Sequence, residues 1–419
     1  MIRDRLKLVL DGLGKLRQPF VPGVHGELEL QVVESRVEFE ALAQQWESLL
    51  ERARLASVFE THDWQCLWWK NYGDDRPLRL VTAKRSGELV GVLPLYIERQ
   101  TVLRVPVRIL RLVGTGGDTS PDDLGPLMAP GHEHEVAEAF VDTILALPGW
   151  DLMLLSDMNP ECAFTTTLAA RARKSGLYTS ESVSAKIAFL DLPQSWDDWL
   201  KSLSGNRRYR IRSSRKQLNA AHPTRFFVWE EDATLDEAVR KLIELHHKRW
   251  RSAGRTDHAF ASERYNRFHA AVMHACMRDD RLRMYCLEAS GVMVAMYYFY
   301  KFRDCIYLMQ SGFDPEYSSL RPGQVLLGYI IEHAIGEGVK TLDFLKGEHR
   351  YKDELATGQR QTVCVTALRR TPGAAAYHTR RRVLPELKAS ALRLAARFRR
   401  QDQASAPQGK EQSSAREDS

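Results

Sequence analysis

The feature that most constrains the fold of this chain is an internal repeat. A serine-glycine pair joins two strand-like runs at Ser86-Gly87, and a second pair does the same 204 residues later at Ser290-Gly291. Short apolar runs on either side of such a turn predict β-hairpins. The strands are expected at residues 78–83 and 89–97 in the first half, and at 282–287 and 292–300 in the second.

Each hairpin is followed by the same series of elements. A third strand comes first, then a loop rich in Gly, Pro and Asp, an amphipathic helix and a short apolar strand. These are expected at 103–113, 114–123, 134–147 and 152–155, and again at 305–310, 312–323, 324–336 and 341–345. Hairpin-linked strands followed by a right-handed crossover helix describe a mixed sheet with helices packed on it. Two lobes of one α/β type are therefore predicted, with their junction near 192–196.

The net charge of +6 is concentrated towards the C-terminus of the 419 residues. Residues 369–400 hold ten basic side chains and one acidic, whereas residues 1–368 hold 48 basic and 49 acidic. From Val383 to Phe398 apolar residues recur at helical spacing among the basic ones, which is typical of a helix on an anionic membrane surface. A solvated terminal helix docked on its own domain is the alternative. A shorter amphipathic pattern covers residues 2–16.

Long apolar runs and paired cysteines are both missing from the sequence. No uninterrupted apolar stretch approaches the roughly 20 residues that span a bilayer, and the N-terminus lacks the pattern of a signal peptide. The six cysteines lie far apart, without a Cys-x-x-Cys pair. We therefore expect an intracellular protein with reduced thiols, no zinc site and no other metal.

The loop before the second crossover helix is a candidate phosphate site. Unpaired amides and the helix dipole favour an anion at a helix N-terminus. Here Arg321 would supply a cation, and Gly323 would let the backbone approach a pyrophosphate, just before Gln324. The alternative is a simple Pro-Gly turn. The corresponding loop at 114–123 is rich in glycine but holds three acids and no base, so we expect it to line an acceptor cleft instead.

The densest polar cluster, residues 343–353, follows the last apolar strand of the second half. Ligands commonly bind at the carboxyl end of a strand in α/β sheets. A carboxylate inside an apolar strand, such as Asp343, needs a partner or faces a cleft. Lys346, Tyr351 and Lys352 could hold phosphates or an anionic acceptor, and Glu348 or His349 could act as a base. A solvent-exposed turn with satisfied ion pairs is the alternative.

A basic segment lies between the two lobes. Residues 201–216 contain seven bases and no acid, and Arg208, Arg212 and Arg215 fall on one helical face. Such a face suits a nucleic acid, a nucleotide-linked sugar or an anionic polymer, although a run of charges is also found on simple solvated surface.

Several of these elements together resemble a known family. They are Trp46 with Leu49-Leu50, the run from Phe59 to Trp64, Gly91 to Leu95, Asp191-Leu192-Pro193, Leu203-Ser204 with Arg207, Arg249-Trp250, Gly312-Phe313-Asp314, Pro322-Gly323, and the run from Asp343 to Lys352. In this order, across about residues 27–369, they resemble the BioF-like or CelD-type (cellulose biosynthesis) acetyltransferases of the GNAT superfamily, which are related to the FemAB peptidoglycan transferases.

The resemblance implies an α/β fold of two tandem GNAT-like (acyl-CoA N-acyltransferase) lobes with mixed sheets. We place an amphipathic segment at 1–26, the lobes at 27–192 and 193–370, a basic amphipathic helix at 371–400 and a disordered tail at 401–419. The implied activity is N- or O-acetyl transfer from acetyl-CoA, or another acyl-CoA, to an envelope or exopolysaccharide acceptor. A FemAB-like transferase that uses aminoacyl-tRNA and a non-catalytic GNAT-like module of polysaccharide synthesis machinery remain as alternatives.

Acyl transfer needs a base for the acceptor, donors for the developing oxyanion and an acid for the departing thiolate. We assign Glu348 or Asp343 as the base and Tyr351 as the acid. The expected cofactor anchors are Arg321, Gly323 and Gln324. The expected acceptor contacts are Lys346, Lys352, Arg207 and Arg249.

These assignments predict a cytoplasmic enzyme with a peripheral contact at the inner face of the membrane through residues 383–400. Nucleic acid is expected as a partner only if aminoacyl-tRNA is the donor.

Deletion of residues 383–419 tests the membrane contact. We expect the full chain to co-sediment with anionic vesicles at low salt and to be released as salt rises, because the attraction is electrostatic. The truncated chain should remain in the supernatant. Equal co-sedimentation of both chains would contradict the prediction.

Overall fold

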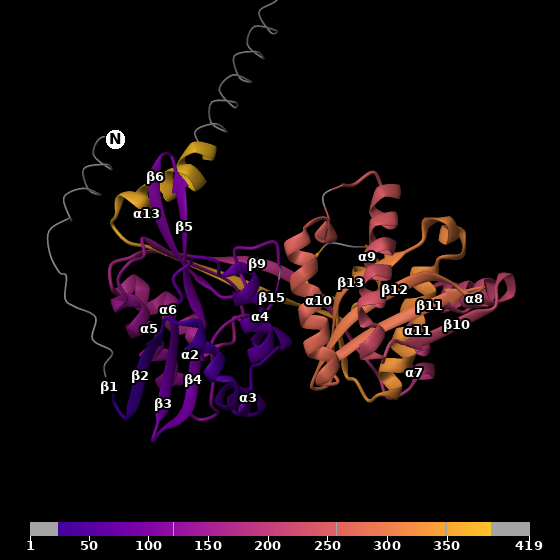
Figure 1. Ribbon diagram of the computed structural model, residues 1–419, viewed down its shortest axis with the longest axis horizontal. Coiled ribbons are helices and arrows are strands. Elements are labelled where there is room, and N and C mark those ends of the chain that lie inside the picture. The colour runs from indigo at the N-terminus through magenta and orange to yellow at the C-terminus, as the bar shows by residue number, and fades with distance from the viewer. Residues whose placement is uncertain (1–23, 120, 257, 348–349, 387–419) are drawn as a thin grey trace, which may run out of the picture. The chain divides into compact units, whose positions relative to one another are not determined.

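The computed structural model describes residues 24–119, 121–256, 258–347 and 350–386, shown as coloured ribbon in Figure 1. The elements of the first half are β1 (Val24–His25), β2 (Leu28–Val33), α2 (Arg36–Ala41), α3 (Ala43–Arg52), η1 (Val58–Glu60), α4 (His62–Tyr72), β3 (Leu80–Arg85), β4 (Glu88–Leu93), β5 (Leu95–Val102), β6 (Val105–Leu112), β7 (Leu127–Met128), α5 (Glu133–Ala146), β8 (Leu152–Met158), α6 (Ala163–Lys174) and β9 (Tyr178–Asp191).

The second half begins with two additional helices. Its elements are α7 (Trp196–Ser202), α8 (Gly205–Ala221), β10 (Thr224–Val228), η2 (Asp232–Thr234), α9 (Leu235–Ser252), η3 (Ala259–Ala261), α10 (Glu263–Arg278), β11 (Leu282–Ala289), β12 (Val292–Phe302), β13 (Cys305–Phe313), η4 (Pro315–Leu320), α11 (Pro322–Gly336), β14 (Thr341–Asp343), α12 (Arg350–Leu355), β15 (Gly358–Leu368), α13 (Pro372–His378) and η5 (Thr379–Val383).

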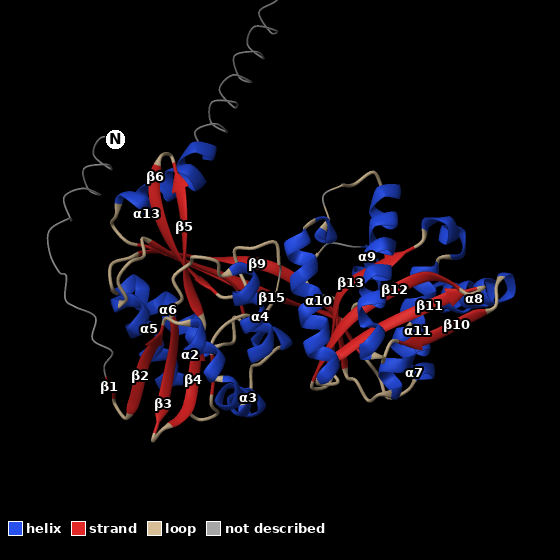
Figure 2. Cartoon of the chain, in the orientation of Figure 1, coloured by secondary structure: helices blue, strands red, loops and turns tan. Residues whose placement is uncertain are grey.

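The strands form two sheets that helices cover, as Figure 2 shows. One sheet has the order β1-β2-β3-β4-β7, and the other has the order β10-β11-β12-β13-β14-β9-β15-β8-β6-β5. Most neighbours are antiparallel, but β13 pairs with β14, and β6 with β8, in parallel. The predicted mixed α/β fold is confirmed.

The repeat is confirmed at the level of backbone geometry. Ser86 and Gly87 have φ values of 52° and 82°, and Ser290 and Gly291 have values of 51° and 78°. Two successive positive φ angles are those of a type I′ turn, whose twist matches that of the strands on either side. Each hairpin also has a register shift at the same place, between Ala83 and Lys84 and between Leu287 and Glu288.

One predicted strand of the first half is in fact two. Residues 89–97 divide at Pro94, so that β4 belongs to the five-stranded sheet and β5 to the ten-stranded sheet. Proline has no N–H to donate to a ladder, so a strand interrupted by it rarely continues in the same sheet. The Pro94 carbonyl instead accepts a hydrogen bond from the amide of Val113 at 3.0 Å.

The two halves exchange their last strands. β9 ends the first half but pairs with β14 and β15 of the second half, and β15 in turn pairs with β8 of the first half. The pairing of β9 with β15 runs from Phe189 opposite Gly358 to Tyr178 opposite Leu368, and Figure 1 shows the two strands side by side. The predicted junction at 192–196 therefore follows a strand that lies within a shared sheet.

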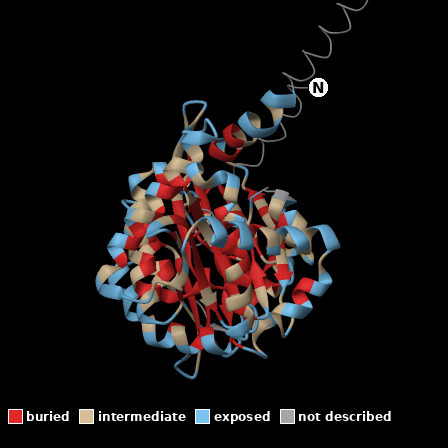
Figure 3. Cartoon of the chain, turned by 90° about the vertical axis from the view of Figure 1, so that its right-hand side faces the viewer, coloured by how far each residue is buried: buried red, intermediate tan, exposed pale blue. Residues whose placement is uncertain are grey.

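The central strands of the second half are buried on both faces (Figure 3). Along β11 and β12, Met284, Cys286, Met296 and Tyr298 pack with the helices α9 and α10, whereas Tyr285, Leu287, Tyr297 and Phe299 pack with α11. This alternation follows from the two-residue period of a strand.

The chain forms two compact units. The smaller one comprises Arg99–Val107 and the described residues from Arg370 onwards, and the larger one contains both repeated halves. The predicted amphipathic helix at 383–398 and the N-terminal pattern at 2–16 lie almost entirely outside the described residues. No helix in the described part of the chain is both long enough and apolar enough to cross a bilayer.

Gly312 tests how closely α9 packs on β13. A Cβ at this position would lie 2.4 Å from the amide nitrogen of His246 and 2.7 Å from the carbonyl carbon of Leu245, so backbone would have to move. We expect Gly312→Ala to lower the free energy of unfolding, measured by urea denaturation, by about 2 kcal/mol. Gly336→Ala is the control, because a Cβ at the exposed Gly336 of α11 would have no atom within 4 Å. Equal stability of the two variants would contradict the prediction.

Candidate functional site

The candidate site lies where β13 and β14 diverge. Their parallel pairing covers only Cys305 to Tyr307 of β13, opposite Thr341 to Asp343 of β14. Beyond it, β13 continues to Phe313, whereas the amide of Phe344 donates to the Ala188 carbonyl of β9. A register shift against β12 also leaves Met309 as an extra residue of β13, between Leu308 opposite Phe299 and Gln310 opposite Tyr298.

A cavity of about 300 Å³ opens beside the start of α11. Four residues of α8 face it at helical spacing, and α12 closes the opposite side. Its lining is Trp199, Arg207, Arg210, Ile211, Ser214, Arg249, Tyr297, Phe313, Ser318, Arg321, Pro322, Gly323, Gln324, Leu327, Gly328, Ile331, Tyr351, Glu354 and Leu355. We call it the larger cavity. Of the ten expected site residues, it brings together Arg207, Arg249, Arg321, Gly323, Gln324 and Tyr351.

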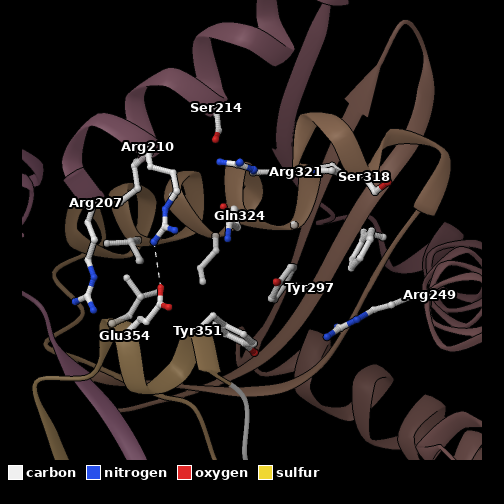
Figure 4. Close-up of a pocket in the computed structure, with 18 of the residues that line it drawn as sticks. Arg207, Arg210, Ser214, Arg249, Tyr297, Ser318, Arg321, Gln324, Tyr351 and Glu354 are labelled. Carbon is white, nitrogen blue, oxygen red and sulfur yellow. Dashed lines mark hydrogen bonds and ion pairs between the residues drawn. The ribbon is translucent and has the colours of Figure 1, made fainter. Parts of the chain in front are cut away.

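The larger cavity is strongly basic (Figure 4). Four guanidinium groups line it, those of Arg207, Arg210, Arg249 and Arg321, against the single carboxylate of Glu354 among the described lining residues. Arg210 pairs with that carboxylate at 3.1 Å. The side chains of Arg207 and Arg321 form no ion pair or hydrogen bond with any residue that the structure describes, so both can meet an anion.

The first turn of α11 adds backbone donors to these charges. Arg321 precedes the helix in the left-handed conformation, with φ 54° and ψ 50°, and Pro322 is the first helical residue. The amides of Gln324 and Val325 both donate to the Arg321 carbonyl. Within the described chain, the amide of Gly323 has no acceptor. Gly323 lines the larger cavity at the N-terminal end of α11, where the positive end of the helix dipole stabilises an anion.

A smaller cavity of about 160 Å³ lies at the divergence of the strands. It shares Arg249 and Tyr351 with the larger cavity, so the two meet at these side chains. Its lining is Phe59, Trp64, Thr119, Pro121, His246, Arg249, Trp250, Tyr265, His269, Leu308, Met309, Gln310, Ser311, Phe344, Leu345, Lys346, Tyr351 and Lys352. Thr119 and Pro121 of the loop at 114–123 thus line a cavity, and that this cavity takes the acceptor stays a prediction.

His246 in the smaller cavity is held as one neutral tautomer. The indole N–H of Trp250 donates to its Nε2 at 2.8 Å, and an indole nitrogen is only ever a donor. Burial lowers the pKa of His246 to about 3, so the ring is neutral near pH 7 and its proton is on Nδ1. This Nδ1 is buried, and the side chain of Gln310 is the polar neighbour that could accept its proton.

Tyr351 is placed to reach both cavities. Burial raises the pKa of its phenol above the ordinary value of 10, so the hydroxyl keeps its proton near pH 7. Its ring meets that of Phe344 edge-on, with centroids 6.1 Å apart. A protonated phenol where the two cavities meet can donate a proton to a group in either of them.

Lys346 and Lys352 hold the chain after β14 in place. The ammonium of Lys346 donates to the Pro121 carbonyl and to Asp157, both at 2.9 Å, and lies 3.4 Å from Asp122. The ammonium of Lys352 donates to three carbonyls, those of Phe344, Leu345 and Lys346. Burial lowers the pKa of Lys352 to about 8. Both lysines thus form the wall of the smaller cavity, with their donors already in use.

Asp343 is part of a buried ion cluster and not of either cavity. Its Oδ1 accepts the amide of Leu345 at 2.7 Å, and its Oδ2 accepts from the guanidinium of Arg360 at 2.7 Å. Arg360 pairs at 2.6 Å with Asp123 on the other side. Because both oxygens are occupied and the residue is 3 % exposed, we do not retain the interpretation of Asp343 as a base. Glu348, the other candidate base, lies outside the described residues.

The sequence pointed to Arg207 on the cavity side of α8 but not to Arg210, which lies on the same side of the helix. The expected stripe of Arg208, Arg212 and Arg215 is not the face that lines the cavity, because Arg215 pairs with Glu332 at 2.6 Å and Arg208 donates to the Leu203 carbonyl. Arg207 and Arg210 lie on the cavity side instead. Helical spacing indicated only the face of Arg208, Arg212 and Arg215, and the position of α11 shows that another face lines the cavity.

Comparisons with known proteins agree with this geometry. Residues 205–353, from the start of α8 into α12, match the family model of the acetyltransferase (GNAT) domain. The parallel pair β13 and β14 and the crossover helix α11 lie within these matched residues, and so does most of the lining of both cavities.

The chain also resembles solved structures over most of its length. The crystal structure of FemX has a TM-score of 0.55 at 10 % identity, over 80 % of this chain and 96 % of that one. L-PGS from Bacillus licheniformis has a TM-score of 0.45 at 12 % identity, over 80 % and 94 %. A tandem GNAT protein from the clavulanic acid biosynthesis pathway has 0.42 at 14 % identity, over 83 % and 99 %. No curated protein matches the chain. The likeness to FemX concerns the fold alone.

The buried Asp122 makes stability depend on pH. Burial raises the pKa of this carboxyl to about 7, although Lys346 opposes the shift. The native carboxyl therefore holds a proton that the unfolded chain releases between about pH 4 and pH 7, so stability is lost as pH rises through this window. We expect the free energy of unfolding of the wild type to fall relative to that of Asp122→Asn by up to about 1.4 kcal/mol per pH unit in urea titrations.

Asp304→Asn serves as the control, because it removes an exposed carboxylate that pairs with Lys340 at 3.3 Å. A constant difference between wild type and Asp122→Asn across this pH range would show that Asp122 does not titrate in the native state.

Proposed function

We propose that this protein transfers an acetyl or other acyl group from acyl-CoA to an amine or hydroxyl of an acceptor related to envelope or exopolysaccharide synthesis. The observation that carries the donor assignment is the larger cavity, where unpaired guanidinium groups and a free helix amide converge at the start of α11 in a GNAT domain. The acceptor class and the BioF-like or CelD type rest on the collinear sequence elements.

The residues present fit the phosphates of CoA. Arg321, Arg207 and the amide of Gly323 would hold the pyrophosphate, because guanidinium groups and helix N-termini both bind phosphate oxygens. The apolar wall of Leu327 and Ile331 on α11 lies beside them. The thioester would then reach the junction of the two cavities at Arg249 and Tyr351.

The smaller cavity supplies the groups that acyl transfer requires. The acceptor's nitrogen or oxygen attacks the thioester carbonyl and the C–S bond breaks, so negative charge develops first on the carbonyl oxygen and then on sulfur. The backbone amide of Met309, at the bulge that lines this cavity, would stabilise the oxyanion. The phenol of Tyr351 would give its proton to the departing thiolate. Glu348 remains our prediction for the base.

Two alternative functions make different demands on the same surfaces. An aminoacyl-tRNA-dependent transferase would use the exposed residues of α8, where Tyr209 is 74 % exposed between arginines. A non-catalytic module would bind neither donor. In each case the chain could still contact a membrane through residues 383–400, and Arg380, Arg381 and Arg382, which come directly before this segment, are exposed.

Calorimetry with acetyl-CoA tests the donor assignment. We expect saturable micromolar binding by the wild type and a loss of at least about tenfold in Arg321→Glu and Arg207→Glu, because each reversal places a carboxylate beside the phosphates. Arg212→Glu is the matched control, since Arg212 is exposed on α8 and does not line the cavity.

Absence of acetyl-CoA binding, with a steeply salt-dependent affinity for tRNA, would favour the aminoacyl-tRNA alternative. Binding of neither would favour the non-catalytic module. An untargeted screen of acceptors with a thiol-release readout would then identify the amine or hydroxyl.

A further inference from the structure

The ion pair between Arg210 and Glu354 crosses the larger cavity. Arg210 projects from α8 and Glu354 from α12, and Figure 4 shows the pair between Arg207 on one side and Gln324 and Tyr351 on the other. Both side chains line the cavity, and their charged atoms are 3.1 Å apart. The pair is therefore inside the space that a ligand would enter.

A carboxylate at this place opposes the binding of an anion. Glu354 is the one acidic side chain among the described residues that line the larger cavity. A phosphate held by Arg207 and Arg321 would be repelled by it, and a phosphate that approached Arg210 would compete with it for the same guanidinium donors. The repulsion of the phosphate and the competition for Arg210 both weaken as the carboxylate of Glu354 moves away from Arg210.

The exchange of carboxylate for phosphate on Arg210 is energetically accessible. The side chains of Arg210 and Glu354 are 44 % and 25 % exposed, and ion pairs that solvent reaches contribute little to stability. Arginine binds phosphate in a bidentate manner, which is among the stronger charge-assisted interactions. A phosphate can therefore displace the carboxylate.

We propose that Glu354 is a built-in competitor for the donor phosphates and holds Arg210 until the donor arrives. This proposal rests on the proposed function, since it takes a polyanionic donor such as CoA to be the ligand. In the empty cavity the pair joins α12 to α8, and in the loaded cavity Arg210 turns to the phosphate and releases α12. Tyr351 lies one turn before Glu354 on the same helix, so the release links donor binding to the side chain that both cavities share.

Removal of the charge on Glu354 tests this role in calorimetry with CoA near 0.15 M salt. We expect Glu354→Gln to bind CoA about threefold to tenfold more tightly than the wild type, because the variant neither repels phosphate nor occupies Arg210. Asp353→Asn is the matched control: it removes an exposed carboxylate of the same helix that does not line the cavity. We expect it to change the affinity less than twofold.

A second variant keeps the test independent of folding effects. Arg210→Gln should cost more affinity in the Glu354→Gln background than in the wild type, where Arg210 is engaged by the carboxylate. Unfolding temperatures without ligand that match the wild type would show that each variant folds.

Unchanged or weaker CoA binding by Glu354→Gln would overturn the competitor role, and so would an equal gain in Asp353→Asn. These outcomes leave the donor assignment intact as long as the wild type binds CoA. Failure of the wild type to bind CoA would instead contradict the proposed function, and the competitor role with it.

Discussion

The guanidinium of Arg360 is the interaction on which the arrangement of this site depends. It lies between Asp123 of the first half and Asp343 at the end of β14, with contacts of 2.6 Å and 2.7 Å. Breaking such a part-buried pair leaves carboxylates without compensation, at a cost of about 3–5 kcal/mol. Together with Lys346, which meets Asp122 and Asp157, it fixes the first-half loop against the second-half strand. The walls of the smaller cavity follow from these contacts.

The charged residues of the site have two different roles, one structural and one in ligand binding. Acidic groups of the first half are used to position the chain after β14, so their partners Lys346 and Arg360 are not available to a ligand. Among the guanidinium groups that line the larger cavity, only that of Arg210 has an acidic partner in the described part of the chain, and this partner is Glu354. Cationic groups without an acidic partner therefore gather in the larger cavity, whereas the smaller cavity, which shares Arg249 with it, presents aromatic side chains, a neutral histidine and a protonated phenol.

Local chemistry made the order of the elements predictable. Hydrophobic periodicity indicated the positions of both Ser-Gly turns, the third strands and the crossover helices. Arg321 and Gly323 lie, as expected, at the start of α11. The division of residues 89–97 into β4 and β5 at Pro94 could also have been predicted, since proline cannot donate to a ladder. The apolar residues on both sides of Pro94 instead indicated one continuous strand. Asp343 was misjudged because its partner, Arg360, is 17 residues away on another strand.

The sequence by itself determined the repeat, its hairpins and the basic character of α8, because each depends on residues that are neighbours along the chain. Only the tertiary structure decided that β9 and β15 exchange between the halves. The backbone N–H and C=O groups along both edges of a strand can pair with any neighbouring strand, so the sequence of the strand does not say which one it joins. It also decided that Arg207 and Arg210 face a cavity while Arg215 packs on Tyr329 with 3.6 Å between the guanidinium carbon and the ring centroid. The basic residues of α8 point in several directions around the helix, and the packing of α8 against α11 decides which of them line the cavity.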